Sequence, residues 1–195
     1  GTSYKIERNK LDEVIGIQDQ IASAFGGFNY VTIQKDGKYN LQEVLLDRED
    51  LENFLNRIIL VYTGISRRAS SVAEQQIEDI KKKKDILDEM QDMVTEGYNY
   101  LISGNLDDFG SLLGKSWKLK RSISNVISNI HIDELYERGV KNGALGGKLL
   151  GAGSGGFLMF FCKDGQRKNV EKSFDKEMLV PFSISESGSK IIYNE

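Results

Sequence analysis

The sequence predicts an α+β fold in which helices pack on an antiparallel or mixed sheet. Two observations carry this prediction: helical segments alternate with hairpin signals along the chain, and some strand-like runs are continuously apolar. The composition, 39% hydrophobic and 28% charged over 195 residues, is that of a globular protein rather than a disordered tail. No repeat or linker-like segment marks an internal boundary.

The first part of the chain predicts a helix followed by a β-hairpin. Residues 9–25 are helical in pattern, with an interruption near Gly16. The strand-like runs 28–33 and 38–44 lie on either side of Asp36-Gly37. Because glycine accepts the positive φ that a tight turn needs, this arrangement indicates a hairpin.

The middle of the chain predicts two helices around a buried strand. Residues 47–56 are charged and amphipathic, which favours a short helix, and the apolar run 58–62 favours a buried strand. Apolar residues at the helical period predict one long helix over 70–101. Within it, the lysines 81–84 are balanced by neighbouring acids, so we interpret them as a solvated face and not as a nucleic-acid patch.

The last part predicts further helices and strands. Asn105 is typical of a helix start. We therefore interpret Asp107 and Asp108 as carboxylates stabilised by the positive end of the helix dipole, and not as metal ligands. Helices are expected over 117–127, 133–141 and 168–177, and strands over 157–162, 179–184 and 190–193.

Several function classes are excluded by composition. A net charge of −3 argues against a dedicated nucleic-acid binder. A single cysteine, Cys162, makes no internal disulfide, and with a single histidine, His131, it argues against a zinc site. We interpret both as structural and Trp117 as core. There is no apolar run of membrane-spanning length and no signal peptide, so we expect a soluble, reduced, cytoplasmic protein without a membrane partner.

The densest chemical signal is glycine, which occupies seven of the fourteen positions of 143–156. Such density lets backbone N–H groups converge on phosphate, but it equally suits a structural turn. Gly151, Gly153 and Gly156 match a dinucleotide fingerprint, which we reject because the segment is expected to follow a helix and open a strand. The P-loop pattern fails as well, since Lys148 is followed by leucine.

A second segment becomes informative only together with the first. In 16–28, Asp19 lies between two amides in a small and apolar stretch. Taken with 146–157, this segment resembles the GHMP small-molecule kinases, which include galactokinase, mevalonate kinase and homoserine kinase. Residues 62–67, 116–120 and 132–136 support the resemblance, and its nearest branch is that of the D-glycero-D-manno-heptose 7-phosphate kinases.

The resemblance implies a domain organisation. It implies the GHMP kinase C-terminal domain, with helices packed on a mostly antiparallel, ferredoxin-like sheet. Nothing in the sequence matches the family's upstream motifs, including the loop for the ATP phosphates. We therefore expect residues 1–195 to be the C-terminal part of such a kinase, with 1–45 completing the edge of the missing N-terminal ATP-binding domain, and to be inactive alone.

The resemblance also implies chemistry, the transfer of the ATP γ-phosphoryl group to a sugar hydroxyl. Asp19 would accept or orient that hydroxyl. The glycines expected beside the substrate and its phosphate are Gly151, Gly153, Gly155 and Gly156. The basic candidates for a substrate phosphate are Arg67, Lys118, Lys120 and Lys148, although the general exposure of lysine and arginine favours a solvated surface charge for each.

The implied cofactors are ATP and Mg²⁺ in the intact enzyme, with none bound to this chain alone and no metal site of its own. The implied partners are a sugar phosphate, the N-terminal kinase domain and a second copy in a homodimer. Two alternatives stay open: another sugar kinase of the family, of fucose or galactose type, and a non-catalytic binding module of the same fold.

Overall fold

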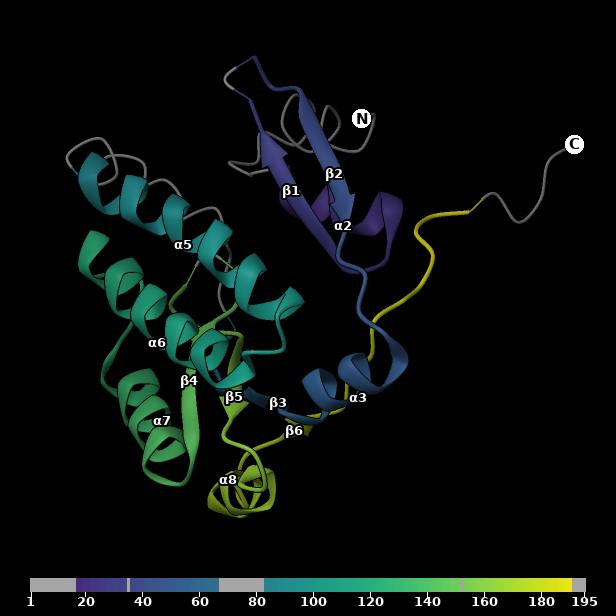
Figure 1. The fold of residues 1–195 in the computed structure, drawn as a ribbon. Coiled ribbons are helices and arrows are strands. Elements are labelled where there is room, and N and C mark those ends of the chain that lie inside the picture. Colours follow the sequence, from purple (N-terminus) through teal and green to yellow (C-terminus); the bar gives the residue numbers. More distant parts are fainter. Residues whose placement is uncertain (1–16, 35, 67–82, 152, 191–195) are drawn as a thin grey trace, which may run out of the picture. The chain divides into compact units, whose positions relative to one another are not determined.

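The computed structural model of the chain describes residues 17–34, 36–66, 83–151 and 153–190 (Figure 1). These residues fall into two units. Unit 1 contains the described residues up to Leu46 together with 183–190, and unit 2 runs from Asp47 to Phe182. Composition gave no sign of this division, and the assignment of 183–190 to unit 1 was not predicted.

Unit 1 is a helix followed by a hairpin, as the sequence predicts for this part of the chain. Its elements are α2 (Gln18–Phe25), β1 (Asn29–Ile33) and β2 (Tyr39–Glu43). The two strands pair antiparallel, with Val31 opposite Leu41. The returning segment 183–190 is bound to the end of α2, where the N–H of Gly188 donates to the carbonyl of Phe25 at 3.1 Å.

Unit 2 is a four-stranded antiparallel sheet with helices packed on it (Figure 1). The strand order is β4-β5-β3-β6. The strands are β3 (Ile58–Tyr62), β4 (Ala144–Leu149), β5 (Phe157–Cys162) and β6 (Leu179–Val180), and the helices are α3 (Arg48–Asn56), α5 (Lys84–Ile102), α6 (Leu106–Ile123), α7 (Ile130–Lys141) and α8 (Arg167–Ser173). The predicted α+β class and antiparallel sheet are confirmed.

The central strand β5 is buried on both of its faces. The ring of Phe160 lies 6.0 Å from that of Tyr136 and 5.4 Å from that of Phe174. The ring of the next residue, Phe161, lies 5.6 Å from that of Phe54 on α3. Because successive strand residues face opposite sides, helices cover both faces, which explains the continuously apolar sequence of this strand.

Helix α6 lies directly on β4 at a contact built from glycines. A Cβ atom added to Gly146 on β4 would lie 2.3 Å from the carbonyl oxygen of Gly110 and 2.8 Å from the Cα of Gly114. Gly110 and Gly114 are four residues apart, so they share one face of α6. One turn further on, Trp117 is 1% exposed, which confirms its predicted place in the core. The two backbones therefore approach each other without side chains between them.

A buried arginine joins three elements of unit 2. Arg57, directly after α3, donates from Nε to the carbonyl of Cys162 at the end of β5, at 3.0 Å. Its Nη2 forms an ion pair with Asp107 in the first turn of α6, and its guanidinium lies 5.1 Å from the ring centre of Phe161. Asp107 therefore lies in the first turn of a helix, as the sequence predicts, and also neutralises the charge of Arg57. Within the described ranges no three His, Cys, Asp or Glu residues gather as a metal site.

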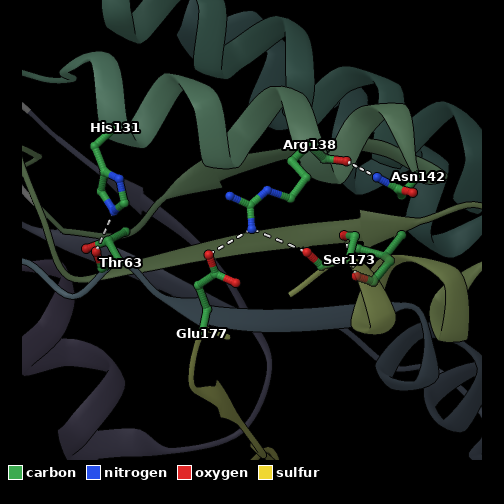
Figure 2. A network of polar contacts seen from close by, with 7 residues as sticks. Thr63, His131, Arg138, Asn142, Ser173 and Glu177 are labelled. Atoms are coloured by element: carbon green, nitrogen blue, oxygen red, sulfur yellow. Dashed lines mark hydrogen bonds and ion pairs between the residues drawn. The ribbon is translucent and has the colours of Figure 1, made fainter. Parts of the chain in front are cut away.

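Helices α7 and α8 are joined by a second arginine (Figure 2). Arg138 donates from Nη1 to Glu177 at 2.8 Å and to the carbonyl of Ser173 at 3.3 Å. Its guanidinium also lies 5.5 Å from the ring centre of Phe174. α8 ends at Ser173, four residues before the predicted end, and Glu177 lies beyond it as the partner of Arg138.

The long helix predicted over 70–101 is wrong in its extent. α5 begins at Lys84, because Lys83 has a non-helical backbone (φ −127°, ψ +38°). Residues 67–82 lie outside the described part of the chain.

Other predicted boundaries also change. Residues 144–149 form β4 although their glycines are poor strand formers, a strand that the sequence did not predict. The strand predicted over 179–184 is reduced to β6 because Pro181 follows it, and proline lacks the N–H that would continue the ladder. Of the strand predicted over 190–193, Lys190 is not in a strand and the rest lies outside the described residues.

The glycine contact between α6 and β4 leads to a first prediction. Gly146→Ala should lower the free energy of unfolding by about 1–3 kcal/mol, because the added methyl group overpacks against helix backbone. In Gly97→Ala, on α5, the methyl group would lie 3.4 Å from a flexible end of Leu112, so stability should stay within about 1 kcal/mol or rise through helix propensity. Urea unfolding of both variants measures this, and equal losses would contradict it.

Candidate glycine-turn site

The predicted glycine motif forms the connection between β4 and β5, which we call the glycine turn (residues 150–156, of which 152 is not described). It follows a strand and not a helix, which corrects the expectation from sequence. It still opens no helix, so the dinucleotide fingerprint remains rejected. At its base the N–H of Leu150 donates to the carbonyl of Phe157 at 2.9 Å, which closes the two strands.

Two neighbouring segments hold the glycine turn in place. The N–H of Ser154 donates to the carbonyl of Ile127, after α6, at 2.8 Å. The N–H of Gly156 donates to the carbonyl of Ile65, after β3, at 2.9 Å. Thr63 donates from its own N–H and from its hydroxyl to the carbonyl of Gly156, both at 2.9 Å. The turn is therefore a rigid part of the sheet edge and not a loose loop.

This anchoring explains the residue types of the turn. Gly153 has φ +121°, and a Cβ atom there would lie 2.9 Å from the carbonyl oxygen of Ile127. Ser154 also has a positive φ, +63°, and is 3% exposed. Its hydroxyl donates to the carbonyl of Val126, a contact that offsets the cost of a left-handed backbone at a residue other than glycine.

Along the turn, backbone N–H groups that are hydrogen-bonded to the protein alternate with groups that are not. Those of Ser154 and Gly156 are bound to the protein, as described above. Those of Gly151, Gly153 and Gly155 have no hydrogen-bond partner within the described ranges of the chain. Free N–H groups on a glycine-rich turn are donors that an anion can accept. Both interpretations left open by the sequence, structural turn and phosphate donor, are compatible with this geometry.

Two of the predicted lysines lie at this turn. Lys120, in the last turn of α6, donates from Nζ to the carbonyl of Gly151 at 2.8 Å. Lys148, at the end of β4, acts on Lys120 by charge repulsion. Burial, together with the charge of Lys148, lowers the pKa of Lys120 to about 8, and burial alone lowers the pKa of Lys148. The structure thus brings Lys120, Lys148 and the glycine turn together.

None of the contacts described at the turn involves the other predicted side chains, Lys118, Arg67 and Asp19. Lys118 is exposed on α6 and lies about 200° around the helix from Lys120, so it does not share the same side of α6. Arg67 lies outside the described residues. Asp19 is exposed in the first turn of α2, in unit 1, whereas the turn and both lysines belong to unit 2.

Two residues without a predicted functional role also lie near the turn or below it. His131, at the start of α7, donates from Nε2 to the carbonyl of Thr63 at 3.0 Å, which fixes α7 to the segment that holds the turn (Figure 2). Cys162 is fully buried, and burial raises the pKa of its thiol to about 11. These contacts agree with the structural roles predicted for both side chains.

Sequence reasoning missed the role of Thr63 as an anchor of the turn. Its signal was present in the Thr63-Gly64 pair at the end of an apolar strand, where a hydroxyl can bond to backbone. A pocket of about 520 Å³ lies at the opposite end of β4, and no predicted site residue lines it. Within the described ranges no helix is long and apolar enough to cross a bilayer.

The sequence and fold match known sugar kinases. Residues 98–179 match the family model described as GHMP kinases C terminal. The D-glycero-alpha-D-manno-heptose 7-phosphate kinase of Campylobacter jejuni is 33% identical over 198 residues, which cover 96% of this chain and 57% of that kinase. The chain therefore spans somewhat more than half the length of this curated relative.

Two solved structures show the same fold. A sugar kinase structure from Campylobacter jejuni superposes with a TM-score of 0.66 at 28% identity, over 96% of this chain and 54% of that one. The galactokinase of Lactococcus lactis, solved with galactose, gives a TM-score of 0.70 at 19% identity, over 95% of this chain and 58% of that one. The predicted C-terminal domain fold is confirmed by these matches.

The strained backbone of the turn gives a second prediction. Gly153→Val should destabilise the fold by about 1–3 kcal/mol, because φ is positive and the side chain meets the carbonyl of Ile127. Gly151→Asn is the control: its φ is +74°, the space around it is open, and asparagine tolerates the left-handed region. Thermal melts would contradict the assignment if both variants melted alike.

The buried thiol gives a third prediction. Native protein at pH 8 should react with iodoacetamide only as fast as it unfolds, because Cys162 is buried and its thiol remains protonated there. In urea above the unfolding midpoint the same thiol should be alkylated completely. Mass spectrometry of timed samples measures both rates, and rapid native labelling would show that β5 is accessible.

Proposed function

Because this chain belongs to the GHMP kinases, and residues 98–179 match the model of their C-terminal part, we propose that the intact protein is an ATP-dependent sugar kinase that phosphorylates a heptose 7-phosphate. The observation that carries the proposal is the cationic glycine turn. A sugar that already bears a phosphate needs positive charge and N–H donors at its binding site, and the two lysines and three free N–H groups supply both.

In the proposed reaction a sugar hydroxyl oxygen attacks the γ-phosphorus of ATP. The bond between the γ-phosphorus and the β,γ-bridging oxygen breaks, and ADP leaves. Asp19 accepts the hydroxyl proton, or orients the hydroxyl for attack. An exposed carboxylate in the first turn of α2 is free to take this role once substrate is bound. Positioning and charge stabilisation account for most of the catalysis in phosphoryl transfer.

The proposed substrate contacts come from the turn and from the basic candidates. Gly151, Gly153, Gly155 and Gly156 shape the sugar site, and the N–H groups of Gly151, Gly153 and Gly155 are available to phosphate. The sequence offers Arg67, Lys118, Lys120 and Lys148 as candidates for the substrate phosphate. Of these, we propose Lys120 and Lys148 as its partners because they lie at the turn, and we leave the exposed Lys118 outside the phosphate site.

The proposed cofactors are ATP and Mg²⁺, held by the intact protein and not by residues 1–195 alone. Magnesium would neutralise charge on the ATP phosphates. We propose that its ligands come from the N-terminal domain of the intact kinase. We further propose that residues 1–45 complete an N-terminal ATP-binding domain, that the protein acts in the cytoplasm, and that a second copy pairs with it.

The proposed substrate has rivals within and outside the enzyme class. A kinase of fucose or galactose type would phosphorylate a neutral sugar, for which two desolvated lysines are a poor match. A non-catalytic module of the same fold would need no carboxylate at position 19. Both alternatives, a kinase for a neutral sugar and a non-catalytic module, are distinguished from the proposed kinase by one assay of ADP release with different acceptors.

The fourth prediction tests the reaction. We expect full-length protein to release ADP with D-glycero-D-manno-heptose 7-phosphate, and not with galactose, fucose or mevalonate. Asp19→Asn should lower kcat by about 10²–10⁴-fold, since the amide keeps the shape and loses the base. Asp36→Asn, which changes an exposed carboxylate of the hairpin, should leave kcat unchanged. Residues 1–195 alone should show no turnover.

Turnover with a neutral sugar would overturn the substrate. Full activity of the Asp19→Asn variant would overturn the mechanism. Absence of turnover with all four acceptors would favour the non-catalytic module.

A further inference from the structure

The basic residues of α6 fall into two groups. Lys115 pairs with Glu89 of α5 at 3.2 Å, and Arg121 pairs with Asp133 of α7 at 2.9 Å. Lys120, between them in the sequence, has no carboxylate partner within the described ranges, and its only polar contact there is the carbonyl of Gly151. Two of the four cations of α6 are therefore neutralised. Of the two without a carboxylate partner in the described ranges, Lys118 is exposed and Lys120 lies at the glycine turn.

The charge next to Lys120 is of the same sign. Lys148 reaches the same region from the end of β4 and also has no carboxylate partner in the described part of the chain. Both side chains are partly buried. Two ammonium groups that are withdrawn from water and repel one another are unfavourable until an anion lies between them. This arrangement indicates a site that is completed by its ligand.

We propose that Lys120 and Lys148 act together as a phosphate clamp, and that binding of the phosphate is coupled to uptake of a proton by Lys120. The choice of phosphate as the anion rests on the function proposed above. The clamp excludes Lys118, which lies apart on α6, and it includes the free N–H groups of the glycine turn.

The proton linkage follows from the surroundings of Lys120. Burial and Lys148 lower the pKa of Lys120 to about 8, so about half of the population is neutral at that pH and most of it is neutral above it. A bound dianion favours the ammonium form and raises the pKa again. Anion affinity is therefore highest below pH 8 and falls as the pH rises through it.

No other titratable group offsets this effect among the described neighbours of Lys120. The segments 63–66 and 124–129 and the described residues of the turn contain none. On α6 and α5, Arg121 and Glu89 are engaged in the ion pairs given above. Opposite Lys148 on β5 stands Met159, which does not ionise.

The fifth prediction uses the 195-residue chain itself. Sulfate is the first probe because it stays a dianion across the range, so any pH dependence belongs to the protein. Its affinity, measured by calorimetry, should fall at least several-fold between about pH 7 and 9.5, as Lys120 loses its proton. Calorimetry at pH 8.5 in two buffers of different ionisation enthalpy should show net proton uptake on binding.

Matched variants identify the residues. Lys120→Met and Lys148→Met should each weaken sulfate and phosphate binding by about tenfold or more, the effect of losing a charged hydrogen bond. Lys118→Met, two residues away and exposed, should bind as the unchanged protein does. Thermal melts without ligand identify any variant that does not fold, and the pH series on the unchanged protein tests the linkage without any substitution.

Two further probes distinguish the source of the phosphate. If Lys120→Met weakens mannose 6-phosphate and spares ADP, the clamp serves the sugar phosphate; if it weakens ADP, the clamp serves the nucleotide. Mannose without phosphate is the control and should not bind. Equal binding by the Lys118→Met and Lys120→Met variants, or sulfate affinity independent of pH, overturns the clamp. These outcomes do not depend on turnover, so failure of the kinase assay and failure of the clamp are separate results.

Discussion

Direct backbone contact between α6 and β4 is the constraint on which unit 2 depends. Gly110 and Gly114 on the helix pack against Gly146 on the strand, where an added Cβ atom would lie 2.3 Å from the carbonyl oxygen of Gly110. Because the helix lies this close, its last turn ends at the end of the strand, and Lys120 reaches the glycine turn. The same closeness brings Lys148 to Lys120. The packing of glycines in the interior thus decides that the ammonium groups of Lys120 and Lys148 lie close enough to repel one another.

The glycines of 143–156 turn out to serve two different purposes. Gly146 and Gly147 belong to β4 and allow close packing. Gly153 and Gly155 belong to the turn, where added side chains would strike the carbonyls of Ile127 and Ile65. A single dense run in the sequence therefore forms part of a packed strand and part of an anchored turn. Counting glycines does not separate the two, whereas the positions of α6 and β3 do.

Local signals account for what the sequence predicted well. The hairpin around Asp36-Gly37, the short helix after Asp47 and the apolar strand β5 each depend on residues within one element. What the sequence missed depends on distant partners. β4 is a strand because α6 and β5 flank it, in spite of weak strand propensity. The pairing of Lys120 with Lys148 likewise requires that α6 lie on β4, which no spacing of residues reveals.

Arg57 carries a consequence for how this domain tolerates sequence change. Its guanidinium is buried, and Asp107 supplies its only carboxylate within the described ranges. Loss of Asp107 alone would leave a desolvated cation, whereas joint replacement by an apolar pair of similar volume would leave none. The order of replacement therefore matters. The Asp107 side chain is 56% exposed and stays solvated when Arg57 is replaced first, whereas replacement of Asp107 first passes through a protein with an unpaired buried cation.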